Sequence, residues 1–119
     1  MYNWLWQAFR AQRFVLCYTT EMLQEYEEKL AHYYSVLFAE NVMNEILNAE
    51  NVERVTIFYK WNLITADPDD NKFVDCAIAA GAQYIVTNDK HFNVLHQIKF
   101  PKVQVADISM FKQIITGLG

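Results

Sequence analysis

Continuous apolar runs of strand length alternate with helix-patterned segments along this chain, and this alternation restricts the fold more than any other feature. Residues 13–18 and 83–87 carry apolar side chains at successive positions rather than at every second one. A strand with that pattern is covered on both faces, as in a parallel sheet between helices. The sequence therefore predicts an α/β fold with a parallel sheet.

The other elements follow from caps and helical periodicity, without a linker, a repeat or a low-complexity segment between them. The pair Thr19-Thr20 supplies an N-cap. Asp67 and Pro68 start a later helix, which Gly81 ends. A chain of 119 residues fits one domain, so we expect residues 1–119 to form a single domain. The predicted helices are 4–9, 21–33, 42–51, 67–81 and 108–118, the further strands are 52–61 and 103–106, and residues 90–96 form a short helical turn.

The glycine content excludes the Gly-rich loops that bind nucleotides, and the net charge argues against binding to nucleic acid by bulk charge. Three glycines are too few for the Gly-rich loops that hold phosphate in P-loop and dinucleotide-binding folds. The formal net charge of −4 does not favour binding to nucleic acid by bulk charge. Any role on nucleic acid therefore has to depend on metal ions or on a local basic patch.

The cysteines and histidines do not form a zinc motif. Cys17 and Cys76 lie inside separate apolar runs, which predicts buried reduced thiols. His91 and His96 are five residues apart, outside the i, i+4 spacing of a helical metal-binding pair. No apolar stretch reaches the length of a membrane-spanning helix, and the N-terminus does not resemble a signal peptide. We therefore expect a cytoplasmic protein.

Asp70 is the acidic residue with the most unusual position. Helical spacing places it in register with Val74 and Ala77, at the centre of the predicted buried stripe. Asp75 falls off that stripe. A carboxylate that points inward has to be hydrogen-bonded, paired with a charge or bound to a metal. The alternative, which the spacing supports equally, is that Asp70 only caps the start of its helix.

Asp89 lies at the end of the predicted strand at 83–87, separated from it by Asn88 alone. Ligand sites in parallel sheets lie beyond the carboxyl ends of the strands, so this position favours a functional carboxylate. The alternative is that Asp89 serves as the N-cap of the helical turn at 90–96.

A third acidic position lies in the helix at 21–33. Glu25 and Glu27 flank its apolar side, and spacing alone does not choose between them. Clustered carboxylates repel one another and suit hard cations, so Mg²⁺ or Mn²⁺ is the expected cofactor. Two such ions can activate a water molecule and stabilise the leaving oxygen of a phosphodiester.

Residues 67–89 combine an acid at the helix start, a small-residue turn at 77–82 and a strand that ends in Val-Thr-Asn-Asp. Residues 18–30 lead from the end of a strand into a helix. These two stretches resemble the second half and the strand-to-helix segment of PIN domains, above all those described as toxin components of toxin–antitoxin pairs. The resemblance covers nearly the whole chain and implies a PIN-like three-layer α/β/α fold.

The resemblance further implies a ribonuclease that uses acidic residues around Mg²⁺ or Mn²⁺. It places the second, third and fourth acids of the family at Glu25, Asp70 and Asp89, and it thereby selects Glu25 over Glu27. Asp67 lies one turn from Asp70 and is a further candidate for metal binding.

Residues near the fourth acid complete the expected site. Thr87 and Asn88 match family positions next to that acid, where a hydroxyl often supports the site. Lys72, Lys90 and His91 are close enough in sequence to the same edge to contact RNA phosphates. For each of these three, an ordinary solvated side chain is the alternative.

The family's first strand, which ends in the first catalytic acid, has no counterpart in this sequence. In the family that strand is central in the sheet, between the strands that correspond to residues 14–18 and 84–87. We therefore expect a chain truncated at its N-terminus, with the central strand missing. The loss of one carboxylate predicts weaker metal binding and slower hydrolysis.

The resemblance also implies partners. These are RNA as substrate, an antitoxin protein that lies across the active-site groove, and a second copy of the chain in a homodimer, with no membrane. The alternative function is a catalytically silent PIN-like module that binds the antitoxin or another protein. A phospho-acceptor receiver domain is a third reading, but the predicted strand at 103–106 lacks the terminal Lys that such a domain needs.

Overall fold

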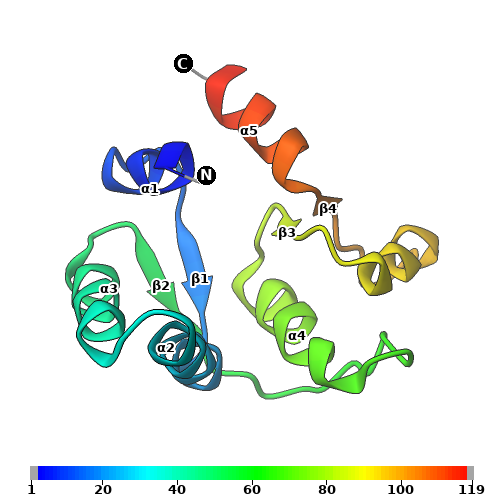
Figure 1. The fold of residues 1–119 in the computed structure, drawn as a ribbon. Coiled ribbons are helices and arrows are strands. Elements are labelled where there is room, and N and C mark those ends of the chain that lie inside the picture. The colour runs from blue at the N-terminus through cyan, green and yellow to red at the C-terminus, as the bar shows by residue number, and fades with distance from the viewer. Residues whose placement is uncertain (1–2, 118–119) are drawn as a thin grey trace. The chain divides into compact units, whose positions relative to one another are not determined.

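A computed structural model describes residues 3–117 of the chain (Figure 1). The described residues form two compact units, and the boundary between them lies between Val55 and Thr56. Each unit contains helices and two short strands, and both strand pairs in the described residues are parallel. The predicted α/β class is therefore confirmed, whereas a single domain with three layers stays a prediction. No helix within residues 3–117 is long and apolar enough to cross a bilayer.

The first unit builds a parallel strand pair from two short strands. Its elements in chain order are α1 (Asn3–Arg10), β1 (Leu16–Tyr18), α2 (Thr20–Tyr33), α3 (Val36–Asn48) and β2 (Val52–Arg54). Leu16 of β1 lies opposite Val52 of β2. Thr19 is the N-cap of α2, as predicted, because its hydroxyl accepts a hydrogen bond from the Met22 N–H at 3.1 Å.

Phe9, Met43 and Ile46 form the core of the first unit. Asn51 ties the loop after α1 to this core. Its side-chain amide donates hydrogen bonds to the carbonyl oxygens of Phe9 and Phe14, both at 2.9 Å. Asn51 itself is buried, so these bonds satisfy an amide that would be costly to leave without partners.

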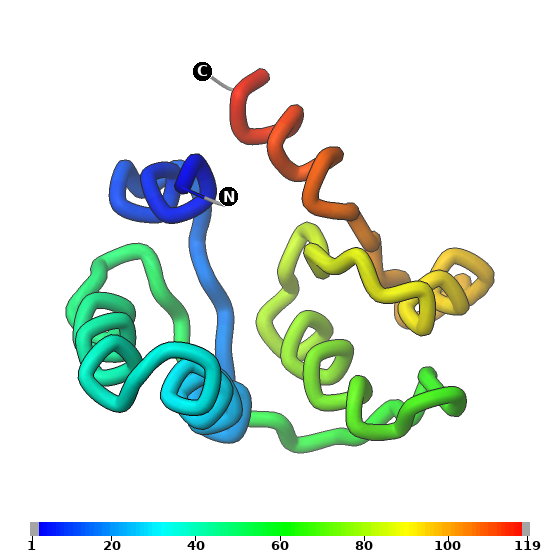
Figure 2. The backbone as a smooth tube through the Cα atoms, viewed as in Figure 1, coloured from blue at the N-terminus to red at the C-terminus, as the bar shows by residue number. Residues whose placement is uncertain are grey.

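The second unit begins with residues 56–67, which have no helix or strand (Figure 2). Its elements are η1 (Pro68–Asp70), α4 (Asn71–Ala80), β3 (Ile85–Val86), η2 (Lys90–Gln97), β4 (Val105–Ala106) and α5 (Ile108–Gly117). β3 and β4 pair in parallel, with Ile85 opposite Val105. Gly81 ends α4 as predicted, at a φ of +65°, which glycine adopts without strain.

Ile64, Val74 and Leu95 lie at the centre of the second unit's core, each at most 1% exposed. Asn71 holds the backbone of Ile64 in place. Its side-chain oxygen accepts from the Ile64 N–H at 2.9 Å, and its amide donates to the Ile64 carbonyl at 2.8 Å. The start of α4 is thus fixed to the loop at 56–67, and this loop leads directly to the acidic residues of η1.

The strand predicted at 52–61 is much shorter in the structure, since β2 contains only Val52–Arg54. The Val55 N–H still donates to the Tyr18 carbonyl at 2.8 Å. β1 ends at Tyr18, because Thr19 caps α2, so no partner remains for a longer second strand.

Asp75 is buried, although helical spacing places it away from the apolar stripe of α4. Its side chain accepts a hydrogen bond from the Trp61 N–H at 3.1 Å, and the residue is 5% exposed. The loop at 56–67 packs along α4 and covers a side of the helix that the periodicity assigns to solvent.

Candidate metal centre

Two carboxylates stand at the start of α4. Asp67 is the N-cap of η1, as predicted, and its Oδ1 accepts a hydrogen bond from the Asp69 N–H at 3.2 Å. Asp70 follows at the junction of η1 and α4, and its side chain makes no capping hydrogen bond. Only 14% of the Asp70 side chain is exposed. The geometry therefore favours the reading in which the Asp70 carboxylate has a use other than capping.

A third carboxylate follows β3 at the start of η2. Asp89 caps η2, because its Oδ1 accepts a hydrogen bond from the His91 N–H at 2.9 Å. Thr87 fixes the backbone of this acid, since its Oγ1 accepts from the Asp89 N–H at 3.0 Å. Asn88 accepts from the Ile108 N–H at 3.1 Å and so connects the same loop to α5. Thr87 thus contacts Asp89 directly, whereas Asn88 acts on the loop.

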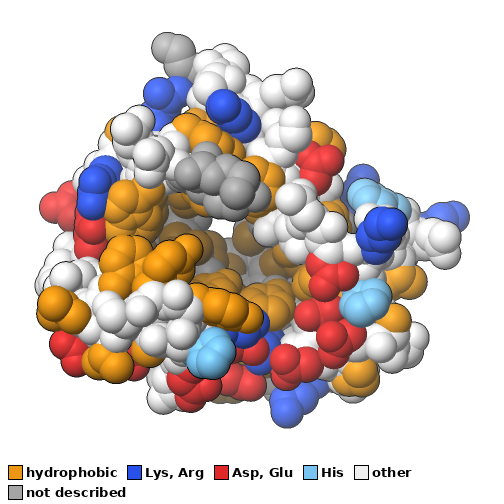
Figure 3. All heavy atoms as spheres, viewed as in Figure 1, with side chains coloured by type: hydrophobic (Ala, Val, Ile, Leu, Met, Phe, Trp, Pro, Cys, Tyr) orange, Lys and Arg blue, Asp and Glu red, His pale blue; other side chains and the backbone are white. Residues whose placement is uncertain are grey.

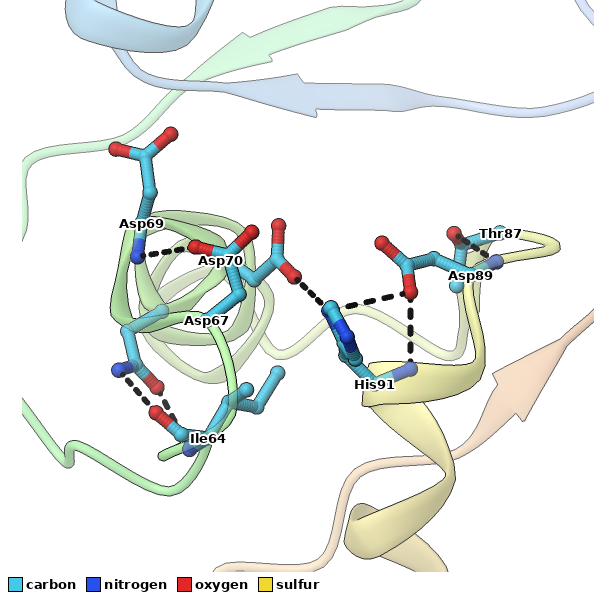
Figure 4. A network of polar contacts seen from close by, with 8 residues as sticks. Ile64, Asp67, Asp69, Asp70, Thr87, Asp89 and His91 are labelled. Carbon is cyan, nitrogen blue, oxygen red and sulfur yellow. Dashed lines mark hydrogen bonds and ion pairs between the residues drawn. The ribbon is translucent and has the colours of Figure 1, made fainter.

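The imidazole of His91 lies between the carboxylates of Asp70 and Asp89 (Figure 4). Its Nδ1 is 3.4 Å from Asp70 Oδ2 and 3.5 Å from Asp89 Oδ1. One ring therefore connects the start of α4 with the loop that follows β3.

The environment of Asp70 disfavours its negative charge. Burial raises the pKa of the Asp70 carboxyl above its ordinary value, and the nearby charge of Asp67 raises it further. The charge of Asp89 acts in the same direction, while the hydrogen bond to His91 lowers the pKa. Like charges at close range are the kind of environment that a bound cation relieves.

Asp67, Asp70 and His91 together offer a donor set that fits a divalent ion. One ligand atom from each of the three lies within 4.8 Å of the others. Two carboxylates suit Mg²⁺ or Mn²⁺, and an imidazole is a common ligand of transition metals. Figure 3 shows carboxylate side chains gathered beside a histidine on the surface of the molecule.

Glu25 lies on α2, in the first unit. Its side chain is 21% exposed, and its Oε1 is 3.8 Å from the Nζ of Lys29 on the next turn. The predicted role of Glu25 in metal binding stays a prediction, as does its preference over Glu27.

The two lysines that are candidate phosphate contacts, Lys72 and Lys90, differ in how exposed their side chains are. Lys72 is largely covered: its Nζ is 3.2 Å from Asp69 Oδ1, and its side chain is 12% exposed. Lys90 is exposed at the start of η2. Lys90 is therefore the better placed of these two lysines to meet a phosphate.

The sequence places His91 among the candidate phosphate contacts, and in the structure its ring faces the carboxylates of Asp70 and Asp89. Its contact with RNA stays a prediction. The available signal for the position of the ring was the spacing from Asp89, because the N-cap of a helix and the residue two positions later lie in the same turn. That spacing shows that the two residues are close, but it does not show that Asp70 comes from another helix to meet them.

A family model described as PIN domain matches residues 2–91 of the chain. The matched range includes all the acidic candidates and ends at His91. No curated protein and no solved structure matches the chain significantly.

Proposed function

The chain belongs to the PIN domain family, whose members are generally nucleases, and from this premise we propose that it is a metal-dependent ribonuclease. The reaction is the hydrolysis of RNA phosphodiesters with Mg²⁺ or Mn²⁺ as cofactor. The observation that carries the proposal is the convergence of Asp70, Asp89 and His91, with Asp67 within reach of the same ion.

The residues of the centre have separable tasks in this reaction. A divalent ion at this centre would supply a Lewis acid to activate water and to offset the charge of the phosphodiester. Asp67 and Asp70 would hold that ion, and Glu25 is the further ligand that the resemblance to the family implies. Asp89 is 42% exposed and is held by its own capping bond. It is thus open to water and has a fixed position from which to accept a proton.

Aromatic side chains of the second unit support single-stranded RNA as the substrate. The rings of Tyr59 and Trp61 are 4.6 Å apart, and those of Trp61 and Phe100 are 6.1 Å apart. Tyr59 and Phe100 are 64% and 83% exposed. Bases stack on exposed aromatic rings without strong sequence preference. Lys60 adjoins these rings in sequence and is exposed, so it is placed to contact the phosphates between stacked bases.

A hollow of about 340 Å³ beside Asp89 supports the same substrate. Thr87, Asn88 and Lys90 line it together with the carboxylates of Asp89 and Asp107. Lys90 can neutralise a phosphate that enters this hollow.

We also propose that the protein is the toxin of a toxin–antitoxin pair, acts in the cytoplasm and forms a homodimer. The support for the dimer is a patch of exposed apolar side chains where α2 ends and α3 begins. Its members are between 44% and 74% exposed, which is unusual for five large apolar residues in one stretch. This apolar turn consists of Tyr33, Tyr34, Val36, Leu37 and Phe38.

The experiment that tests the nuclease proposal is cleavage of a labelled single-stranded RNA with Mn²⁺ and with a chelator. Asp70→Asn should lower the cleavage rate by about a hundredfold or more, because it removes a charged ligand. Asp69→Asn is the matched control, since Asp69 is adjacent and 70% exposed. In the same assay Glu25→Gln should be impaired and Glu27→Gln should not.

The alternative of a silent binding module makes the opposite prediction. In that case the wild-type chain would show no metal-dependent cleavage and would still bind an antitoxin. Cleavage that survives both the chelator and Asp70→Asn would contradict the proposed mechanism.

A further inference from the structure

We infer that His91 is a metal ligand rather than a phosphate contact, and that it makes the centre select Mn²⁺ and similar transition metal ions over Mg²⁺. The inference rests on the proposed metal centre and specifies which ions that centre takes.

The surroundings of His91 favour a cation and disfavour a phosphate. Its Nδ1 faces Asp70 Oδ2 at 3.4 Å and Asp89 Oδ1 at 3.5 Å (Figure 4). An RNA phosphate that approached this nitrogen would meet two carboxylates. A cation at the same place would instead be attracted by both of them.

The backbone of His91 is fixed, while its ring retains some freedom to move. The backbone N–H of His91 donates to Asp89 Oδ1 at 2.9 Å, so the first turn of η2 is fixed against the carboxylate that its ring also meets. The side chain is 44% exposed, which leaves the ring free of core packing that would resist a small movement. Local structure thus orients the imidazole toward Asp89, and the packing of α4 and η2 on a common core brings Asp70 to the same ring.

The donor spacing needs little change to close around an ion. The ligand atoms of Asp67, Asp70 and His91 lie within 4.8 Å of one another. Metal–ligand bonds of about 2.1 Å keep two donors on opposite sides of an ion about 4.2 Å apart, and neighbouring donors closer than that. Rotations of partly exposed side chains are sufficient for that contraction.

The chemistry of the donors then sets the preference among ions. Mg²⁺ prefers oxygen ligands and retains several water molecules, so an imidazole adds little to its binding. Mn²⁺ and the later transition metals bind imidazole nitrogen more readily than Mg²⁺ does, and the affinity of a site for these metals increases from Mn²⁺ to Cu²⁺. A centre with two carboxylates and one imidazole therefore discriminates against Mg²⁺ more strongly than a centre of carboxylates alone does.

The direct test is pulsed electron paramagnetic resonance of Mn²⁺ bound to the full chain labelled with ¹⁵N-histidine. The wild-type protein should show hyperfine coupling between Mn²⁺ and histidine nitrogen. His91→Ala should lose that coupling, and His96→Ala should keep it, because His96 is an exposed histidine of the same helix that is outside the donor group. Mn²⁺ bound without nitrogen coupling in the wild type would overturn the inference.

Calorimetric titration gives a second, independent measure. His91→Ala should weaken Mn²⁺ binding by about tenfold or more and Mg²⁺ binding by about threefold or less. His91→Asp, which substitutes an oxygen donor, should bring the two affinities closer together. Equal losses for both ions, or no binding of Mn²⁺ by the wild type, would overturn the inference.

The two experiments distinguish a failure of the inference about His91 from a failure of the nuclease proposal. If Asp70→Asn abolishes RNA cleavage while the Mn²⁺ spectrum shows no histidine nitrogen, the nuclease proposal stands and the role of His91 is wrong. If nitrogen coupling is present but no RNA is cleaved, the metal ligand is established and the nuclease proposal fails.

Discussion

At the scale of single residues, Asp70 shows how position in the fold changes the chemistry of a common side chain. The sequence placed it on the inward side of a helix start, where two readings were equally supported. In the structure its side chain makes no capping bond and is 14% exposed. Its pKa is raised first by burial and then by the charge of Asp67. Ionisation of Asp70 therefore lowers the stability of the metal-free folded protein relative to the form in which this carboxyl is neutral.

This predicts how Asp70→Asn affects stability without metal. A carboxyl whose pKa is higher in the folded than in the unfolded state binds its proton more tightly when folded, so stability falls as pH rises through that interval. The wild type should therefore lose stability relative to Asp70→Asn as pH rises above about 4, the ordinary pKa of an aspartate. At neutral pH with a chelator, the variant should have the higher Tm.

The measurement is a series of thermal melts of both proteins between about pH 3 and pH 8, with the unfolded-state pKa near 4 as the reference point. Below that value the Asp70 carboxyl of the wild type is protonated in both the folded and the unfolded state, and the difference between the two Tm values should become independent of pH. Asp69→Asn, with its exposed side chain, controls for a general loss of negative charge. A Tm difference that is independent of pH over the whole range would contradict the argument.

At the scale of elements, the start of α4 is held by side chains that the sequence pattern did not single out. Asn71 makes two hydrogen bonds to the backbone of Ile64, and Asp75 accepts one from Trp61. Asn71 and Asp75 are both buried. Helical periodicity assigns polar residues to the solvated side, because it contains no information on where a distant loop will pack. The loop at 56–67 thus positions the helix that carries Asp70.

Asn71→Ala should therefore destabilise the protein by about 2–3 kcal/mol, because it leaves a buried N–H and a buried carbonyl of Ile64 without their partners. Urea denaturation followed by circular dichroism measures this. Asn93→Ala is the control, since Asn93 is exposed on η2, and its cost should be below about 0.5 kcal/mol. Equal costs for the two substitutions would show that the Asn71 bonds do not hold the loop.

At the scale of the whole molecule, exposed apolar residues point to assembly. The apolar turn at the end of α2 and the start of α3 contains Leu37, which is 68% exposed. Removing such a surface from water is the main favourable contribution to association, at roughly 25 cal/mol per Å². The proposed homodimer would cover it.

Leu37→Glu should then convert the dimer to a monomer, because two new carboxylates would have to be buried against apolar side chains. Light scattering coupled to size-exclusion chromatography measures the mass directly. Asn41→Glu adds the same charge to an exposed position of α3 one turn further on and should leave the dimer intact. A wild-type chain that remains monomeric at high concentration would refute this assembly.

The sequence alone determined the order of the elements, several of their boundaries and the family. Caps and stops are local, so Thr19, Asp67 and Gly81 could be identified from their neighbours and have the predicted roles. Strand length was not determined in this way, because a strand extends only as far as its partner does. The segment at 52–61 is apolar enough for a longer strand, but its partner β1 ends at Tyr18.

Only the tertiary structure decided which side chains meet. Asp70 and His91 are separated by 21 positions in the chain and belong to different helices, yet their side chains are 3.4 Å apart. Periodicity gives the direction in which each side chain points from its own helix, and the packing of α4 and η2 on a common core gives the distance between them. The acidic residues could thus be identified from the sequence, whereas the position of the His91 imidazole between two of them depended on the fold.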